Sequence, residues 1–284
     1  MDMGFALERS RERGEKMLRV GVIGCGTIGA EICLAIDSGL VQAELVGIHD
    51  VLAAATERVA QRLRHAPPVL SQEELMETAD LVVEATSREV APGIIRAALG
   101  RGRDIMVMSV GGLLTCLEEA LALAQRGNRH IYVPTGAIAA LDAVKGATVA
   151  TVSRVTLTTR KPPRALAGAP FVVANRIDLE GLREPTVIFK GSAAAAVPAF
   201  PANINVAAAL SLAGIGPERT EVRVIADPTG DKNTHEIEME GSFGRMVARM
   251  ENVPSPTNPK TSYMASLSAI ALLRRLTSPL VIGT

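Results

Sequence analysis

A short glycine-rich segment near the start of the chain restricts the fold more than any other feature. It reads Gly24-Cys25-Gly26-Thr27-Ile28-Gly29, follows the short, β-branched apolar segment 18–24, and precedes the helical pattern 30–37. A strand that turns on glycines directly into a helix is the first half of a strand–helix–strand unit. The apolar segment 43–50 supplies the second strand. The sequence therefore predicts that the chain starts a parallel sheet here.

The alternation of apolar strands and amphipathic helices continues to about Pro134. It predicts a doubly wound, Rossmann-type α/β domain with a parallel sheet and short loops. The predicted strands are 18–24, 43–50, 80–85, 105–110 and 130–133, and the predicted helices are 30–37, 53–64, 90–99 and 113–125.

Beyond Pro134 the strands alternate apolar and polar residues, which is typical of a sheet with one exposed face. Segment 235–240 turns at Gly241-Ser242 and returns as 243–250, which predicts an antiparallel hairpin. This region is expected to be an α+β domain with an open, mostly antiparallel sheet and helices on one face. The remaining predicted strands are 152–159, 186–189 and 220–226, and the predicted helices are 192–197, 206–212 and 261–276.

The chain is expected to contain an N-terminal extension and two domains. Residues 1–16 are dense in Arg and Glu and have no apolar core of a signal peptide. A dinucleotide-binding domain is predicted over 17–133 and is completed by a C-terminal helix within 259–284. The second domain occupies 134–258. Because no run of 18 apolar residues occurs, we expect a cytoplasmic protein that does not enter a membrane.

The three glycines of the motif have distinct predicted roles. Gly24 permits the tight turn, Gly26 lets the backbone approach a pyrophosphate, and Gly29 lets the helix pack closely on the strand. The pyrophosphate would lie at the helix N-terminus, beside Thr27 and Ile28, where the helix dipole favours negative charge. The alternative is a glycine turn without a ligand.

Asp50 ends the second strand, where a carboxylate can hydrogen-bond the ribose hydroxyls of the adenosine half of a dinucleotide. Its charge would repel a 2′-phosphate, so NAD is favoured as the cofactor. Arg58 and Arg62 on the next helix leave NADP use open. A solvated strand-end carboxylate is the simpler alternative for Asp50.

Small residues follow the next two predicted strands. Ala85 and Thr86 come after one, and Ser109-Val110-Gly111-Gly112 comes after the other. Ligands of open α/β sheets bind at this carboxyl edge, so the ribose–nicotinamide half could lie there. The alternative is that both segments are ordinary tight turns.

The second region contains residues that could transfer a proton or bind a carboxylate. His235 is the only one of the four histidines in this region, and the unperturbed pKa of histidine suits proton transfer near neutrality. Arg160, Lys161, Arg164 and Lys260 are cations that could bind a dicarboxylate. The alternatives are that His235 is an ordinary surface histidine at the start of a strand and that the cationic side chains are only solvated.

Two further segments could contact a nicotinamide ring. Ala137 lies in the run of small residues at the exit from the first domain, where a flat ring can pack closely. Asn203 and Asn205 precede an alanine-rich helix. Asn203 could equally be a plain N-cap of that helix.

Composition excludes several classes of function. The formal net charge is 0, which argues against nucleic acid and anionic membranes as partners. Aromatic residues make up only 2% of the chain, which makes base-stacking platforms and aromatic cation cages poor candidates for the function. The three cysteines show neither CxxC nor Cys/His metal spacing, which predicts reduced thiols and no metal site. A small polar ligand remains.

Taken together, six motifs resemble the L-aspartate dehydrogenase family, and the likeness extends from about Met17 to the C-terminus. The glycine motif is shared with many dehydrogenases, whereas the other five are more specific. The six motifs are 24–29, Thr135-Gly136-Ala137-Ile138, Leu157-Thr158-Thr159-Arg160-Lys161, the segment 200–207, Thr234-His235-Glu236-Ile237 and Asn258-Pro259-Lys260-Thr261-Ser262-Tyr263.

The resemblance implies a homodimeric enzyme whose second domain carries catalysis and dimerisation. It implies oxidation of L-aspartate to iminoaspartate with NAD or NADP, the product hydrolysing to oxaloacetate and ammonia or entering NAD biosynthesis. His235 would be the catalytic acid/base, and Ala137 with Asn203 or Asn205 would contact the nicotinamide. The alternatives are a reductase of the dihydrodipicolinate reductase or homoserine dehydrogenase type, and a non-catalytic NAD-sensing protein.

Overall fold

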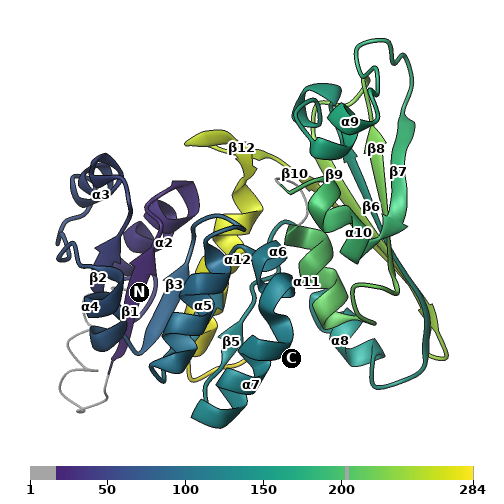
Figure 1. Ribbon diagram of the computed structural model, residues 1–284. Helices are drawn as coiled ribbons and strands as arrows, with labels where there is room; N and C mark the ends of the chain where they lie inside the picture. Colours follow the sequence, from purple (N-terminus) through teal and green to yellow (C-terminus); the bar gives the residue numbers. More distant parts are fainter. Residues whose placement is uncertain (1–16, 202–204, 284) are drawn as a thin grey trace. The chain divides into compact units, whose positions relative to one another are not determined.

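The computed structural model describes residues 17–201 and 205–283, which divide into two compact units (Figure 1). The first unit comprises the chain up to Pro134 together with Ser266–Ile282. The second comprises Thr135–Ala265, with Gly283. The predicted N-terminal extension, 1–16, lies outside the described residues.

The first unit is built on a five-stranded sheet in the order β2-β1-β3-β4-β5, and all its strand pairs are parallel. This confirms the predicted Rossmann-type fold class. The strands are β1 (Leu18–Ile23), β2 (Ala43–His49), β3 (Leu81–Glu84), β4 (Asp104–Val107) and β5 (Ile131–Tyr132). The helical segments are α2 (Thr27–Asp37), α3 (Ala53–Ala60), α4 (Gln72–Thr78), α5 (Ala91–Gly100), α6 (Val110–Leu113), the 3-10 turn η1 (Leu114–Cys116), α7 (Leu117–Gly127) and α12 (Tyr263–Leu276).

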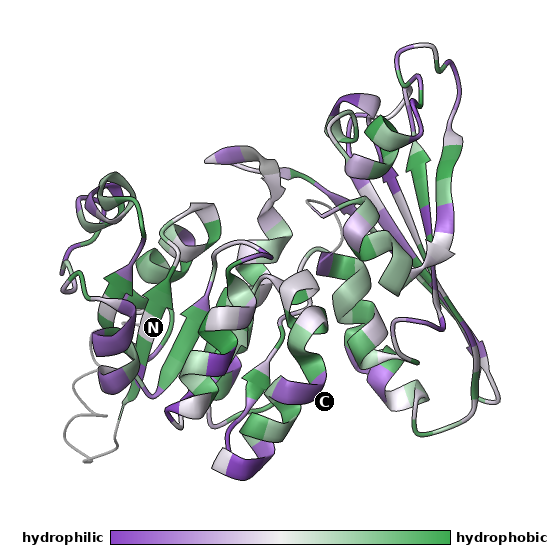
Figure 2. Cartoon of the chain, viewed as in Figure 1, coloured by the Kyte–Doolittle hydropathy of each residue, from purple (hydrophilic) through white to green (hydrophobic). Residues whose placement is uncertain are grey.

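Helices cover both faces of this sheet because its strands are apolar on both sides (Figure 2). On one face Val22 and Met106 join a buried cluster that includes Ile32 of α2 and Leu273 of α12. On the other face a Cβ at Gly21 would collide with Leu75 of α4, so the small residue lets that helix lie close to β1. The C-terminal helix is thus part of the core of the first unit.

The strand order reverses direction beside β1, since β2 lies on one side of it and β3 on the other. In open α/β sheets this reversal opens a crevice at the carboxyl ends of the strands, where ligands bind. The glycine turn 24–29 leaves β1 at that edge.

The second unit contains a five-stranded sheet in the order β10-β9-β6-β8-β7. Only β6 and β8 pair in parallel, so the sheet is mostly antiparallel, as predicted. Its strands are β6 (Val152–Lys161), β7 (Thr186–Ser192), β8 (Thr220–Ala226), β9 (Asn233–Gly241) and β10 (Gly244–Asn252), and a separate ribbon pairs β11 (Pro254–Ser255) with β12 (Asn258–Ser262). The helical segments are α8 (Leu141–Ala147), the 3-10 turn η2 (Pro163–Ala165), α9 (Pro170–Ala174), α10 (Ala193–Ala199) and α11 (Asn205–Ala213).

Several predicted element boundaries are wrong. The helix predicted over 53–64 ends at Ala60, and the one predicted over 113–125 is interrupted by the 3-10 turn at Leu114–Cys116. The helix predicted over 261–276 begins at Tyr263 because the two residues before it belong to β12, where Ser262 pairs with Pro254. Pairing within this short local ribbon takes precedence over the helical pattern at the boundary.

Helix α4 was not predicted, although its N-terminus carries a sequence signature. The Ser71 hydroxyl accepts a hydrogen bond from the Glu74 amide at 3.2 Å, and the Glu74 carboxylate accepts one from the Ser71 amide at 2.9 Å. This is the capping box that the pattern Ser-x-x-Glu encodes.

The three cysteines are buried and form no disulfide. Burial raises the pKa of the Cys25 thiol to about 12, so it is not a reactive thiolate. In residues 17–201 and 205–283, no group of three His, Cys, Asp or Glu side chains could hold a metal ion. None of the helices in this described part of the chain has the length and apolarity needed to cross a membrane.

Candidate active site

The glycine turn connects β1 to α2 in a geometry that requires two of its three glycines. Gly24 has a φ of +101°, and a Cβ there would collide with the backbone oxygen of Ala85. A Cβ on Gly29 would collide with the backbone oxygen of Gly24. At Gly26, by contrast, a Cβ would meet no heavy atom within 4 Å. Gly26 therefore faces open space, while the other two make the turn compact.

The N-terminus of α2 suits an anion. Gly26 is the N-cap residue, no side chain caps the helix, and its first turn, which starts with Thr27 and Ile28, carries no acidic residue. The positive end of the helix dipole is therefore not neutralised from within its own first turn. The open space at Gly26 and this helix end fit the pyrophosphate of a dinucleotide.

The Asp50 carboxylate is fixed beside this turn by two backbone amides. One oxygen accepts a hydrogen bond from the Cys25 amide at 2.7 Å, and the other accepts one from the Leu52 amide at 2.9 Å. The first bond ties the end of β2 to the glycine turn. A carboxylate held in this way could accept a hydrogen bond from a ribose hydroxyl of a dinucleotide.

Glu84, the last residue of β3, is hydrogen-bonded to the two loops that follow β3 and β4 at the carboxyl edge of the sheet. It is 0% exposed, yet its carboxylate accepts hydrogen bonds from the amide and the hydroxyl of Thr86 and from the amide and the hydroxyl of Ser109. Sequence reasoning singled out Ala85, Thr86 and the segment 109–112 but missed Glu84. A charged residue ending an otherwise apolar strand is the signal that could have found it.

In the second unit, the predicted site residues Lys161 and His235 lie on one face of the sheet together with Thr159, which was not predicted. Thr159 and Lys161 are two residues apart in β6 and so point to the same side, and His235 of β9 pairs with Thr159. The Thr159 hydroxyl and His235 Nδ1 are 3.1 Å apart and hydrogen-bonded. All three residues are buried, with Lys161 7% and His235 4% exposed.

Burial changes the proton affinity of both bases. Burial first, and the nearby Lys161 ammonium second, lower the pKa of His235 to about 3. Burial lowers the pKa of Lys161 to about 8. The imidazole is therefore neutral near physiological pH, whereas Lys161 is a cation that loses its proton only slightly above it.

Arg160 is separated from these groups. Strand alternation places it on the opposite face from Thr159 and Lys161, and its guanidinium donates to the buried Asp227 carboxylate at 3.2 Å. The Thr229 hydroxyl and amide bind the other oxygen of Asp227. Hydrogen bonding from Thr229 and then Arg160 outweighs burial and lowers the pKa of Asp227. Arg160 thus anchors the loop after β8.

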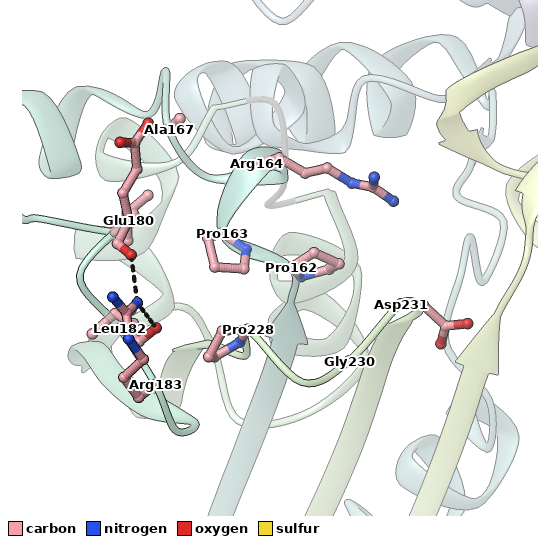
Figure 3. A pocket seen from close by; sticks show the side chains of 11 residues that line it. Pro162, Pro163, Arg164, Ala167, Glu180, Leu182, Arg183, Pro228, Gly230 and Asp231 are labelled. Carbon is pink, nitrogen blue, oxygen red and sulfur yellow. Dashed lines mark hydrogen bonds between the residues drawn. The ribbon is translucent and has the colours of Figure 1, made fainter.

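A cleft of about 660 Å³ opens where β6 and β8 end. Figure 3 shows Arg164 and Asp231 on one side of it and Glu180 and Arg183 on the other. Arg183 donates to the carbonyl oxygens of Glu180 and Leu182 and so braces its own loop. The cleft follows Lys161 directly in sequence, since Pro162, Pro163 and Arg164 line it.

Ala137 is positioned by a buried amide that sequence reasoning missed. Asn252 Nδ2 donates to the backbone oxygen of Ala137 at 3.0 Å, and Asn252 Oδ1 accepts from the Ser262 hydroxyl at 2.8 Å. The loop with Ala137 also contains Gly136 and Ala140, both with positive φ. A hydrogen-bonded asparagine thus links this loop to the end of β12.

The predicted site residues fall into two groups. The glycine motif, Asp50, Ala85 and Thr86 come together in the first unit, and Lys161 and His235 come together in the second. Asn205 is the first residue of α11 and is exposed. Asn203 and the side chain of Lys260 lie outside the described residues, although the Lys260 backbone forms part of β12.

Comparison with known sequences gives two family matches and several full-length relatives. The family described as "Aspartate dehydrogenase, C-terminal" matches residues 142–276, and the one described as "Homoserine dehydrogenase, NAD binding domain" matches residues 24–134. An L-aspartate dehydrogenase of Methanosarcina barkeri is 50% identical over 94% of this chain and 100% of its own. One of Bradyrhizobium diazoefficiens is 44% identical over 94% of each.

Solved structures agree on the fold. An aspartate dehydrogenase from Thermotoga maritima superposes with a TM-score of 0.71 at 24% identity, over 95% of this chain and 100% of that one. A homoserine dehydrogenase from Thiobacillus denitrificans gives a TM-score of 0.58 at 13% identity, over 93% of this chain and 75% of that one. The fold is therefore shared with solved structures of low sequence identity.

Proposed function

The chain belongs to the L-aspartate dehydrogenase family, and from this premise we propose that it oxidises L-aspartate to iminoaspartate with NAD. The iminoaspartate then hydrolyses to oxaloacetate and ammonia or enters NAD biosynthesis. The observation that carries the proposal is the buried group of Thr159, Lys161 and His235 on one face of the second sheet. It combines a neutral imidazole with a buried cation, as a reaction on an anionic amino acid requires.

The first unit holds the cofactor in this proposal. The open space at Gly26 and the N-terminus of α2 receive the pyrophosphate, and Asp50 receives the adenosine ribose. The match of residues 24–134 to an NAD-binding domain family supports this arrangement. The nicotinamide ring, when bound, supplies the acceptor for the hydrogen and two electrons that leave the substrate Cα.

Lys161 binds a substrate carboxylate. Burial has removed hydration from the ammonium and lowers its pKa, so an incoming carboxylate would offset part of that desolvation. Arg160 is less suited because it faces the other side of the sheet and donates to Asp227. Arg164, exposed at the rim of the cleft, is our candidate for the second carboxylate.

His235 handles the amine proton. Its hydrogen bond to Thr159 occupies Nδ1 and fixes the ring, which leaves Nε2 to face the substrate. In the tautomer whose Nδ1–H donates to the Thr159 hydroxyl, the neutral ring leaves Nε2 to accept the proton of the substrate amine or to orient the water that hydrolyses the imine. A substrate carboxylate bound at Lys161 would offset the ammonium charge that contributes to the low pKa of the ring.

The test is an NADH-formation assay with L-aspartate, homoserine, L-glutamate and L-alanine, each with NAD and with NADP. We expect turnover with L-aspartate and NAD, and turnover confined to homoserine would favour the alternative suggested by the homoserine dehydrogenase match. His235→Ala should lose at least 100-fold in kcat and still bind NADH. His65→Ala, a change of an exposed histidine in the first unit, is the matched control. Absence of L-aspartate activity in the wild-type protein would refute the proposal.

We also propose that the enzyme is a homodimer, as its family resemblance implies. Light scattering of the purified protein checks this, and a mass equal to one 29.8 kDa chain at assay concentration would contradict it.

A further inference from the structure

Glu84 is a charged residue in a place that usually excludes charge. It closes the fully buried strand β3 and is 0% exposed. Its carboxylate is stabilised by neutral donors, namely the Thr86 amide and hydroxyl, both at 2.7 Å, and the Ser109 amide and hydroxyl at 3.0 and 2.9 Å. Burying a carboxylate is costly, and the packing of an apolar strand does not by itself require one at this position.

The four hydrogen bonds connect two neighbouring strand ends at the edge of the sheet where the glycine turn lies. Thr86 follows β3 and Ser109 follows β4, and these strands pair in parallel. The same segment borders the turn, because the Ala85 amide donates to the Ile23 oxygen and a Cβ on Gly24 would meet the Ala85 oxygen. Glu84 therefore fixes both loops relative to the glycine turn.

The hydrogen bonds also fix the direction of the two hydroxyl groups. A carboxylate only accepts, so both hydroxyls donate their single proton to Glu84. Their oxygen lone pairs remain for donors that approach from the sheet edge. The ribose hydroxyls and the carboxamide NH₂ of a nicotinamide riboside are donors of this kind.

We propose that Glu84 is a positioning residue for the nicotinamide-ribose half of the dinucleotide: it holds the hydroxyls of Thr86 and Ser109 as hydrogen-bond acceptors at the carboxyl edge of the first sheet. The inference rests on the proposed binding of NAD and does not depend on which amino acid is oxidised. The adenosine half is served by Asp50 and the glycine turn, so the two halves of the cofactor respond to different residues.

The experiment compares the affinities of NADH and ADP for the full-length protein by calorimetry, without substrate. ADP carries the adenosine half and the pyrophosphate but no nicotinamide riboside. In Glu84→Gln one carboxylate oxygen becomes an NH₂ group that faces a backbone N–H donor. We expect the Kd of NADH to rise at least 10-fold and the Kd of ADP to change less than 2-fold. Thr86→Val should likewise raise the Kd of NADH and leave that of ADP nearly unchanged, whereas Thr86→Ser, which keeps the hydroxyl, should bind both with wild-type affinity.

Glu74→Gln, which alters the exposed capping box of α4 in the same unit, is the matched control and should leave both Kd values unchanged. If Glu84→Gln does not fold, the Thr86 variants carry the test. An unchanged Kd of NADH, or equal losses for NADH and ADP, would overturn the proposal, the latter by indicating a purely structural role. Wild-type protein that binds NADH but does not oxidise L-aspartate would refute only the proposed substrate.

Discussion

Replacing Lys161 by methionine should stabilise the fold while it removes substrate binding. The side chain is 7% exposed, and burial lowers its pKa from 10.5 to about 8. At about 1.4 kcal/mol per pKa unit, the charged ammonium costs the folded state about 3 kcal/mol at pH 7. Methionine fills a similar volume without charge, so Lys161→Met should raise the free energy of unfolding by an amount of that order.

The pH dependence separates the charge from any change in packing. Because the folded pKa lies below the unfolded one, the unfolded chain binds more protons between pH 8 and 10.5, and wild-type stability rises with pH through this window. The cost of the charge should fall from about 3 kcal/mol at pH 7 to about 1 kcal/mol at pH 10. The advantage of Lys161→Met should therefore shrink by about 2 kcal/mol between these pH values.

The assay is urea unfolding of both proteins at pH 7 and pH 10, followed by circular dichroism. Lys190→Met is the control, because Lys190 is exposed on the same sheet and its ion pair with Glu221 is a surface one. That variant should differ from the wild-type protein by less than about 1 kcal/mol. An advantage of Lys161→Met that is absent at pH 7, or equal at both pH values, would refute the reasoning that the buried charge is costly.

Three further predictions concern single residues of the two groups. The pKa of His235 is about 3 in the folded protein and an ordinary 6.5 in the unfolded chain, so the unfolded chain takes up the proton first as the pH falls. Between pH 7 and pH 5 the free energy of unfolding of the wild-type protein should therefore fall by about 2 kcal/mol more than that of His235→Gln, as measured by urea unfolding. Gly26→Ala should keep the free energy of unfolding within about 1 kcal/mol of the wild-type value yet weaken NADH binding at least 10-fold. Gly29→Ala should lower the free energy of unfolding by at least about 2 kcal/mol, because its Cβ collides with the Gly24 backbone. Equal stability of the two variants would contradict this geometry. Asp50→Ser should lower the ratio of kcat/KM for NAD to that for NADP at least 10-fold, and an unchanged ratio would exclude Asp50 from cofactor selection.

The sequence predicted best those features that depend on neighbours along the chain. The roles of Gly24 and Gly29 follow from backbone conformation and close approach, and the structure has a φ of +101° at Gly24 and no room for a Cβ at Gly29. The alternation in the segment 235–240 likewise defined a strand of a mostly antiparallel sheet, because side chains of a strand point to opposite faces in turn. Where sequence reasoning failed, as at the start of α12, pairing with the short strand β11 just before it replaced the helical preference.

Tertiary structure decided how deeply each charged group is buried and which of them share a face. Arg160 and Lys161 are adjacent cations in sequence, yet one donates to Asp227 and the other lies buried near His235. Glu84 ends an apolar strand, and this signal was missed; its contact with Ser109 arises only when β3 and β4 pair. Local sequence determines backbone geometry and periodicity, whereas burial and hydrogen bonding between distant segments set proton affinity and orientation. The sequence alone thus specified a dinucleotide fold and its family, and the folded chain decided how each charged group is held.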